Sequence, residues 1–170
     1  MKNVLIIISG MPATGKTRFA EWLSTEICIP LLSLDEVWEN SGGSDIPFAQ
    51  YWTLCESKIK SSSSLIVEFG FNNGIKPIID GLVKKFNYQT INVHFDTAFE
   101  IAHYRFNDRR LYDMGGVKPR ITLEQYIDIA AQSKNFYFGD SIIYVDTTDF
   151  SIVSYEDLAK QIQQYSIQTI

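Results

Sequence analysis

The sequence predicts an α/β protein in which helices cover both faces of a five-stranded parallel sheet, and three observations lead to this fold class. Five short apolar runs, rich in β-branched and aromatic residues, alternate with segments whose apolar residues recur at helical spacing. The first run, Val4–Ile8, is uninterrupted, which is typical of a strand buried on both faces. The length of 170 residues suits one hydrophobic core. We therefore expect a single doubly wound domain with three α/β/α layers.

The strands are predicted where an apolar run is bounded by turn residues or by a helical pattern. In chain order they are Val4–Ile8, Leu31–Ser33, Leu65–Phe69, Tyr88–Phe95 and Ile142–Val145. Parallel α/β sheets bind their ligands at the carboxyl ends of the strands. Residues that follow these runs are therefore candidates for a functional site.

The helices are predicted from apolar residues that fall on one helical face, together with residues that start or stop a helix. Asp45 with Pro47 has the form of a helix start, and Thr122–Gln125 has the form of a capping box. In chain order the predicted helices run from Lys16 to before Pro30, over about 46–60, over about 75–86, over about 98–110, from Thr122 onward, and around Leu158 and Ile162. In the helix that begins at Thr122, we expect Leu123, Tyr126, Ile127 and Ala130 to point inward.

The composition restricts the partners and the location of the protein. The formal net charge is -5, which argues against a nucleic-acid partner because affinity for the phosphate backbone comes from clustered cations. The two cysteines, Cys28 and Cys55, lack metal-ligand spacing, and we expect buried thiols in a reducing cytoplasm. No apolar run is long enough for a membrane span. We expect a cytoplasmic monomer or homodimer.

The most specific motif is GMPATGKT, which matches the Walker A pattern G-x-x-x-x-G-K-[ST] at every fixed position. Glycines allow the backbone to turn so that successive N–H groups point at phosphate oxygens, and the following helix adds its own N–H groups and dipole. The lysine reaches the β- and γ-phosphates of ATP, and the threonine hydroxyl is a ligand for Mg²⁺. The candidate contacts to the nucleotide are Gly10, Met11, Pro12, Ala13, Thr14, Gly15, Lys16, Thr17 and the adjacent Arg18.

Other classes of P-loop protein lack support in the sequence. A GTPase needs a base-reading Asn/Thr-Lys-x-Asp segment after a late strand, and none is present. AAA-type motors and ABC ATPases need a longer chain and signature segments of their own. With the Walker A loop, the chain resembles the small P-loop kinases, which include gluconate- and shikimate-type kinases, chloramphenicol phosphotransferase, zeta toxins and polynucleotide-hydroxyl kinase domains. The resemblance covers nearly the whole chain, but only the loop is sharply diagnostic.

Two arginines precede a predicted lid. Arg105 and Arg109 are four residues apart and so share a helical face, where two cations repel each other unless an anion lies between them. A solvated basic helix is the alternative. The resemblance implies that Arg105 lies against adenine, that Arg109 reaches the phosphates, and that a short Arg-bearing lid spans about 110–120, ending at Arg120. It also implies that backbone around Thr147, which follows the last strand, encloses adenine.

Three further residues are candidates for the acceptor side. The resemblance implies that Asp35, just past the second strand, acts on the acceptor hydroxyl, whereas its position also suits a helix N-cap ahead of Trp38. Trp38 either lines the acceptor pocket or packs in the core. Glu68 stands where the resemblance implies a Walker-B-like Asp, and this departure leaves three roles open: ordering Mg²⁺ through water, contacting the substrate, or a structural role.

The sequence thus predicts an ATP- and Mg²⁺-dependent phosphotransferase that acts on a hydroxyl group of a small molecule, with Lys16, Arg109 and Asp35 as catalytic residues. Lys16 and Arg109 would spread the charge of the transferring phosphoryl group, and Asp35 would orient or deprotonate the acceptor. Two alternatives stay open. One is a kinase that acts on polynucleotide ends, and the other is a non-catalytic ATP-binding switch or assembly module.

Overall fold

The structure is a computed structural model that describes residues 3–33, 53, 56–57, 64–70, 75–112, 120–131, 138 and 141–167. Strands and helices alternate along these residues, as the hydrophobic patterns predict. The elements are β1 (Val4–Gly10), α1 (Lys16–Ile27), β2 (Leu31–Ser33), β3 (Leu65–Glu68), α4 (Ile75–Phe86), β4 (Gln89–Asp96), α5 (Phe99–Tyr112), α6 (Leu123–Ala131), β5 (Ser141–Asp146), the 3-10 turn η2 (Phe150–Ile152) and α7 (Tyr155–Ile167).

The five strands form one parallel sheet in the order β2-β3-β1-β4-β5, which confirms the predicted fold class. The central strand, β1, is buried along its whole length, in agreement with its uninterrupted apolar run. After β1 the chain forms β2 and β3 on one side of this strand, and later β4 and β5 on its other side. The carboxyl end of β1 is therefore at the switch point, where α/β sheets bind their ligands.

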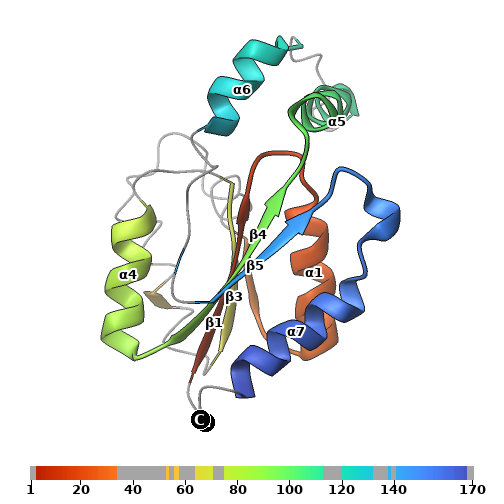
Figure 1. Ribbon diagram of the computed structural model, residues 1–170. Coiled ribbons are helices and arrows are strands. Elements are labelled where there is room, and N and C mark those ends of the chain that lie inside the picture. The colour runs from red at the N-terminus through yellow and green to blue at the C-terminus, as the bar shows by residue number, and fades with distance from the viewer. Residues whose placement is uncertain are drawn as a thin grey trace.

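The core consists of two apolar layers, one on each face of the sheet. Alternate side chains of β1 enter opposite layers, because successive residues of a strand point to opposite faces. Ile6 and Ile8 pack with α1 and α7, whereas Leu5 and Ile7 pack on the face covered by α4. Figure 1 shows α1 and α7 on one side of the sheet and α4 on the other. The three-layer arrangement is therefore confirmed.

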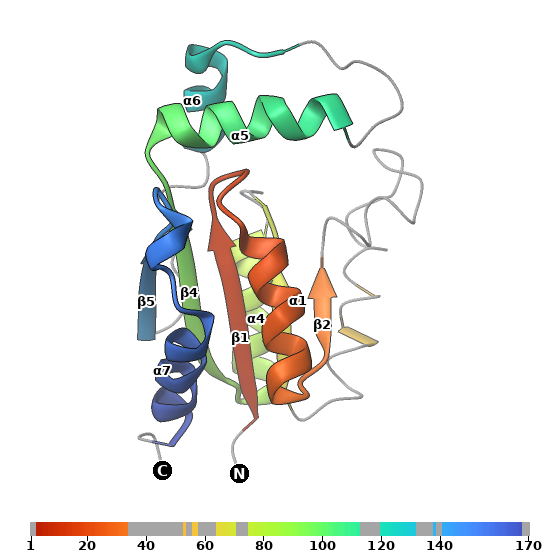
Figure 2. The same ribbon diagram turned by 90° about the vertical axis from the view of Figure 1, so that its right-hand side faces the viewer.

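Helices α5 and α6 lie across the carboxyl end of the sheet (Figure 2). The predicted capping box is present at the start of α6, since Thr122 N–H donates to Gln125 Oε1 and Gln125 N–H donates to Thr122 Oγ1. Tyr126 and Ala130, one turn apart, are buried on the inner face. The prediction that Ile127 points inward is wrong, because it lies next to Tyr126 on the helix and is therefore turned toward solvent, 36% exposed.

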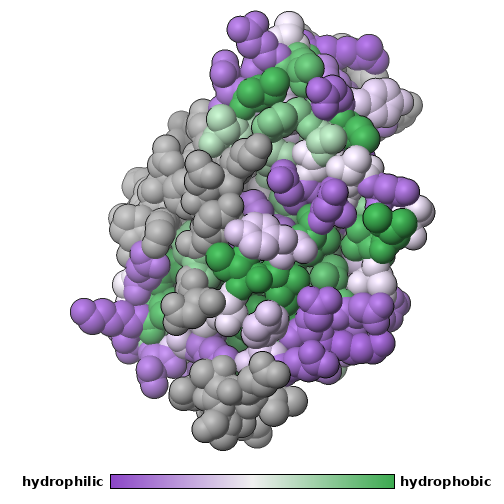
Figure 3. Space-filling view, viewed as in Figure 1, coloured by the Kyte–Doolittle hydropathy of each residue, from purple (hydrophilic) through white to green (hydrophobic). Residues whose placement is uncertain are grey.

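The edge strand β5 has only one covered face near its carboxyl end. Ile143 and Val145 are buried in the layer that contains α7, while Tyr144 points the other way and is 61% exposed. On the side of the molecule seen in Figure 3, hydrophobic side chains gather over the middle and hydrophilic ones lie along α7. The predicted strand was correct, and its exposure follows from its position at the edge of the sheet.

Two further features of the structure differ from the prediction, and two predicted segments lie mostly outside the described residues. Cys28, expected to be buried, is exposed because it forms the C-cap of α1 in a left-handed conformation with φ 53°. The helix α5 continues to Tyr112, two residues beyond its predicted end. The predicted helix over 46–60 lies mostly outside the described residues, as does the predicted lid apart from its two ends.

Candidate active site

The Walker A loop connects the buried end of β1 to the first turn of α1. Three of its residues have positive φ: Gly10 at 134°, Ala13 at 63° and Gly15 at 87°. A Cβ on Gly10 would overlap the Phe95 carbonyl oxygen, so the loop leaves the sheet only because this residue has no side chain. Gly10 is therefore required by close packing against backbone as well as by its backbone conformation, and Gly15 is favoured by its positive φ.

Carbonyl groups of the loop accept hydrogen bonds from side chains of the protein. Met11 C=O accepts from Thr14 Oγ1 at 2.8 Å and from the Lys16 ammonium at 2.7 Å. Thr14 C=O accepts from the Thr147 hydroxyl at 3.0 Å. Lys16 is itself buried, which keeps its charge inside the loop. Carbonyl dipoles are thus engaged by the scaffold, an arrangement that suits a loop whose N–H groups serve an anion.

A cavity of about 490 Å³ opens above this loop. Among the described residues, the charged lining is mainly cationic: Glu68 contributes one carboxylate, and α1 and α5 contribute four cations, Lys16, Arg18, Arg105 and Arg109. The other lining residues are Pro12, Ala13, Gly15, Thr17, Gly70, Phe106 and Phe150. Arg105 and Arg109 line the same cavity, as their spacing on one helical face predicts. The site is built to receive an anion.

Glu68 is held at the floor of the cavity by two hydroxyl groups. The side chain is 1% exposed, its Oε1 accepts from Thr17 Oγ1 at 3.2 Å, and its Oε2 accepts from Ser33 Oγ at 3.2 Å. A carboxylate beside a P-loop threonine, next to an open cavity, is the hard-oxygen donor set that Mg²⁺ prefers. Mg²⁺ usually keeps several waters and takes few protein ligands, so these two residues fit the ion.

Arg105 is oriented by the segment that follows β5. Its guanidinium donates to the Thr147 carbonyl at 2.8 Å and to the Thr148 carbonyl at 3.1 Å, and it lies 4.2 Å from the centre of the Phe150 ring. The Phe150 ring in turn covers Gly15, where any Cβ would stand 2.7 Å from it. The guanidinium and the ring therefore form one wall of the cavity, directly over the loop.

Several solved structures with a similar fold are those of kinases of similar size. A protein of Chloroflexus aurantiacus named as a candidate kinase has a TM-score of 0.77 and 21% identity, covering 97% of this chain and 99% of that one. APS kinase of Mycobacterium tuberculosis, in complex with AMPPNP and APS, has a TM-score of 0.63 and 12% identity over 96% and 97%. Shikimate kinase of Acinetobacter baumannii, in complex with shikimate, has a TM-score of 0.58 and 16% identity over 99% and 96%.

This chain has the fold of the small P-loop kinases. No family model matches its sequence, and no curated protein matches it either. At these identities the shared feature is the fold. Within the described part of the chain, no helix is both long and apolar enough to cross a membrane.

The P-loop kinase fold brings most of the predicted site residues together, but not all of them. Gly10, Met11 and Thr14 belong to the loop but are not part of the cavity lining. The Thr147 side chain is fully buried, and only its carbonyl contacts a cavity residue, Arg105. Arg120 is exposed and is not part of the lining. Asp35 and Trp38 lie outside the described residues.

Sequence reasoning missed Phe150 and Ser33. Phe150 follows the last strand in a 3-10 turn that Asp149 caps through the Ser151 N–H, and only the packing of that turn places the ring over the loop. Ser33 ends β2, and its register with Glu68 in the parallel sheet brings the two side chains into contact. The one available signal was for Ser33, because it ends a predicted strand and Glu68 lies near the carboxyl end of another.

Both histidines contact polar groups of the protein. His94 is buried, its Nδ1 lies 3.0 Å from Ser9 Oγ, and burial lowers the pKa of its imidazole. Ser9 Oγ also accepts from Asn92 Nδ2 at 2.9 Å. His103 Nε2 lies 2.8 Å from the Ile121 carbonyl. These contacts join β1 to β4 and α5 to the segment that precedes α6.

Proposed function

We propose that the protein is an ATP- and Mg²⁺-dependent phosphotransferase that moves the γ-phosphoryl group to a hydroxyl group of a small molecule. The observation that carries the proposal is the cavity in which Lys16 from the loop and two arginines from α5 line one space with Glu68. A nucleotide-binding loop alone needs no second set of cations. Cations that approach the phosphates from a different element are what phosphoryl transfer requires, since charge builds up on the transferring group.

Each charged residue has a proposed role. Lys16 and Arg109 stabilise the negative charge that spreads over the equatorial oxygens of the transferring group. Arg105, already pinned by two backbone carbonyls, orients the nucleotide base. These roles rest on position in the cavity and on charge.

Thr17 and Glu68 are the residues that we propose hold Mg²⁺. Of the three roles left open for Glu68, its contact with the Thr17 hydroxyl favours metal binding. When bound, the ion would supply positive charge beside the β- and γ-phosphate oxygens. Ser33 bonds the second carboxylate oxygen and so limits the rotation of Glu68.

We propose Asp35 as the residue that handles the acceptor hydroxyl. In the sequence it follows the end of β2 by two residues, and α/β sheets bind their ligands beyond the carboxyl ends of their strands. In the reaction the acceptor oxygen forms a bond to the γ-phosphorus, the bond from that phosphorus to the bridging oxygen of ADP breaks, and the hydroxyl proton passes to the Asp35 carboxylate. A positioned base of this kind accelerates such reactions by about a hundredfold or more.

A small-molecule acceptor is supported by two observations. The protein carries a formal net charge of -5, which disfavours a polynucleotide. The kinases that share its fold include one in complex with APS and one in complex with shikimate.

The test is a screen of ATP consumption against nucleosides, sugars, antibiotics and oligonucleotides, followed by Asp35→Asn on the acceptor that reacts. We expect Asp35→Asn to keep ATP affinity and lose about a hundredfold or more in turnover. Asn caps a helix as well as Asp does, so the variant separates catalysis from capping. Phosphorylation of oligonucleotide ends alone would favour a polynucleotide-end kinase, and ATP binding without transfer to any acceptor would favour a switch or assembly module.

A further inference from the structure

The hydroxyl of Tyr126, on α6, reaches across the carboxyl end of the sheet to the Walker A loop. It donates to the Pro12 carbonyl at 2.7 Å, a contact between residues 114 positions apart in the chain. The Tyr126 ring is fully buried and belongs to an apolar cluster with Met11, Ala102 and Ala130. The donor of this part-buried hydrogen bond is therefore held inside the protein, while its acceptor belongs to a residue that lines the cavity.

Pro12 and Ala13 share the peptide bond on which this hydroxyl acts, and both residues line the cavity. In a trans peptide the C=O and the following N–H point in opposite directions. A carbonyl drawn toward Tyr126 therefore turns the Ala13 N–H away from α6. Ala13 has φ 63°, a left-handed conformation that is costly for a residue with a side chain and persists only where its surroundings hold it.

We propose that Tyr126 is a positioning residue that holds the Pro12–Ala13 peptide in the orientation in which the Ala13 N–H serves the bound phosphate. This inference rests on the proposed function only in that the loop binds the phosphates of a nucleotide. It adds α6 to the parts of the protein that form the phosphate site, although α6 contributes no residue to the cavity lining.

Two sets of contacts hold Tyr126 in place, and the pKa of its hydroxyl keeps it a donor. The residue that precedes the capping box, Ile121, is held on α5 because Asn107 bonds both its N–H and its C=O, each at 3.0 Å. The ring packs against Phe106 at 5.6 Å between centroids. Burial, and secondarily the charge of Asp96, raises the pKa of the Tyr126 hydroxyl to about 12, so it keeps its proton across the physiological range.

The decisive variant is Tyr126→Phe, which removes the hydroxyl and keeps the ring. Affinity would be measured by calorimetry for Mg·ATP and for tripolyphosphate, a probe that lacks base and ribose. We expect both affinities to fall by about the same factor, roughly five- to tenfold, as the loss of one hydrogen bond in a preorganised site implies. Arg105→Ala should lower the affinity for ATP by a larger factor than the affinity for tripolyphosphate, because Arg105 is the residue proposed to orient the base.

The control is Tyr104→Phe, which removes the hydroxyl of a ring that is 71% exposed on α5 and should change neither affinity. A Tyr126→Phe protein that is less stable but binds both probes as the parent does would show a purely structural hydroxyl and overturn the inference. The parent protein provides a measurement that needs no variant: tripolyphosphate should shift the Ala13 amide resonance and protect that N–H from hydrogen exchange. An unchanged Ala13 amide in the bound protein would also overturn the inference.

The outcomes separate this inference from the proposed function. Parent protein that binds ATP but transfers phosphate to no acceptor contradicts the proposed kinase activity and leaves the role of Tyr126 standing. If the parent protein binds neither Mg·ATP nor tripolyphosphate, both the proposed function and the role of Tyr126 are overturned. Equal binding by parent and Tyr126→Phe overturns the inference alone.

Discussion

Arg105 and Arg109 are one helical turn apart on α5, yet their surroundings differ. Arg105 is held by the Thr147 and Thr148 carbonyls and lies against the Phe150 ring. Arg109 lines the same cavity one turn further along the helix and is exposed. A side chain fixed before the ligand arrives suits recognition of the nucleotide. An exposed cation that lines the same cavity one turn away suits the charge that develops during transfer.

We predict that the two arginines affect different kinetic constants. Arg109→Ala should lower turnover by about a hundredfold or more and change ATP affinity little, because it acts on transition-state charge. Arg105→Ala should instead raise the apparent ATP requirement, by roughly five- to tenfold for lost stacking and hydrogen bonds. Steady-state kinetics at varied ATP concentration would distinguish the two effects. Lys85→Ala, which removes a surface ion pair with Glu56, is the control.

A parent-like turnover in Arg109→Ala would mean that this arginine is only a solvated helix residue. If Arg105→Ala lowered turnover and left the ATP requirement unchanged, the proposed assignment of the two side chains would have to be exchanged.

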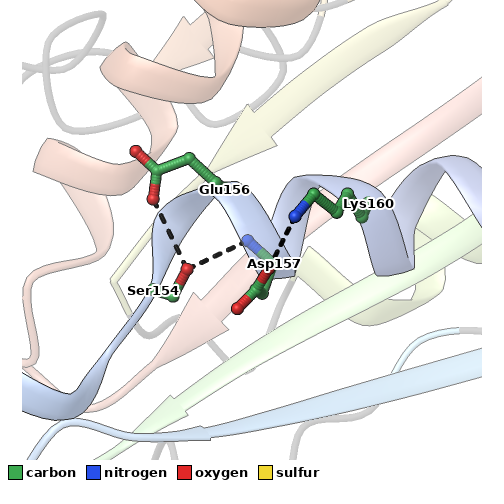
Figure 4. A network of polar contacts seen from close by, with 4 residues as sticks. All are labelled: Ser154, Glu156, Asp157 and Lys160. Carbon is green, nitrogen blue, oxygen red and sulfur yellow. Dashed lines mark hydrogen bonds and ion pairs between the residues drawn. The ribbon is translucent and has the colours of Figure 1, made fainter.

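At the scale of elements, the first turns of α6 and α7 are capped by side chains of neighbouring residues in the sequence. Thr122 and Gln125 form a capping box at α6. At α7 the Ser154 hydroxyl accepts from the Asp157 N–H at 3.2 Å and donates to Glu156 Oε2, while Lys160 pairs with Asp157 at 2.9 Å (Figure 4). Because α7 covers one face of the sheet with Leu158 and Ile162, its start bears on the stability of that layer.

We predict that Ser154→Ala lowers the free energy of unfolding by about 1 kcal/mol, the usual effect of removing an N-cap hydroxyl. Ser154→Asn should restore most of the loss, since Asn accepts the same N–H bond. Urea unfolding followed by circular dichroism measures both variants. An alanine variant as stable as the parent would show that neighbouring groups or water satisfy the Asp157 N–H.

On the scale of the whole molecule, the site lies where separate layers meet. The loop comes from the β1–α1 connection, Glu68 from the end of β3, and the arginines from α5, which crosses the carboxyl end of the sheet (Figure 2). A nucleotide in the cavity would contact several of these elements simultaneously. Its binding energy should therefore stabilise the folded chain as a unit.

We predict that Mg·ATP raises the melting temperature of the protein, because a ligand that binds only the folded state at a hundred times its Kd adds about 2.7 kcal/mol. Lys16→Ala should remove most of this shift, since the variant lacks the buried ammonium of the loop. Thermal denaturation with and without Mg·ATP tests the prediction, and each protein without ligand is its own baseline. An equal shift in Lys16→Ala and parent would place the nucleotide elsewhere.

Much of the site was predictable because its residues follow strands in the sequence. The Walker A loop and Glu68 each come directly after an apolar run, and parallel strands end at one edge of the sheet. The spacing of Arg105 and Arg109 predicted a shared face for the same kind of local reason. Phe150, by contrast, has no local signal, since its ring reaches Gly15 only through the path of the chain after β5.

By itself, the sequence determined the parallel three-layer fold, the phosphate loop and the capping box, because hydrophobic period, motif spacing and capping chemistry are local properties of the chain. Only the tertiary structure decided which side chains hold the loop and Glu68 in place. Tyr126 at Pro12, Thr147 at Thr14 and Ser33 at Glu68 are contacts between residues far apart in the chain. Such contacts depend on register and helix placement, which follow from the packing of all the layers together.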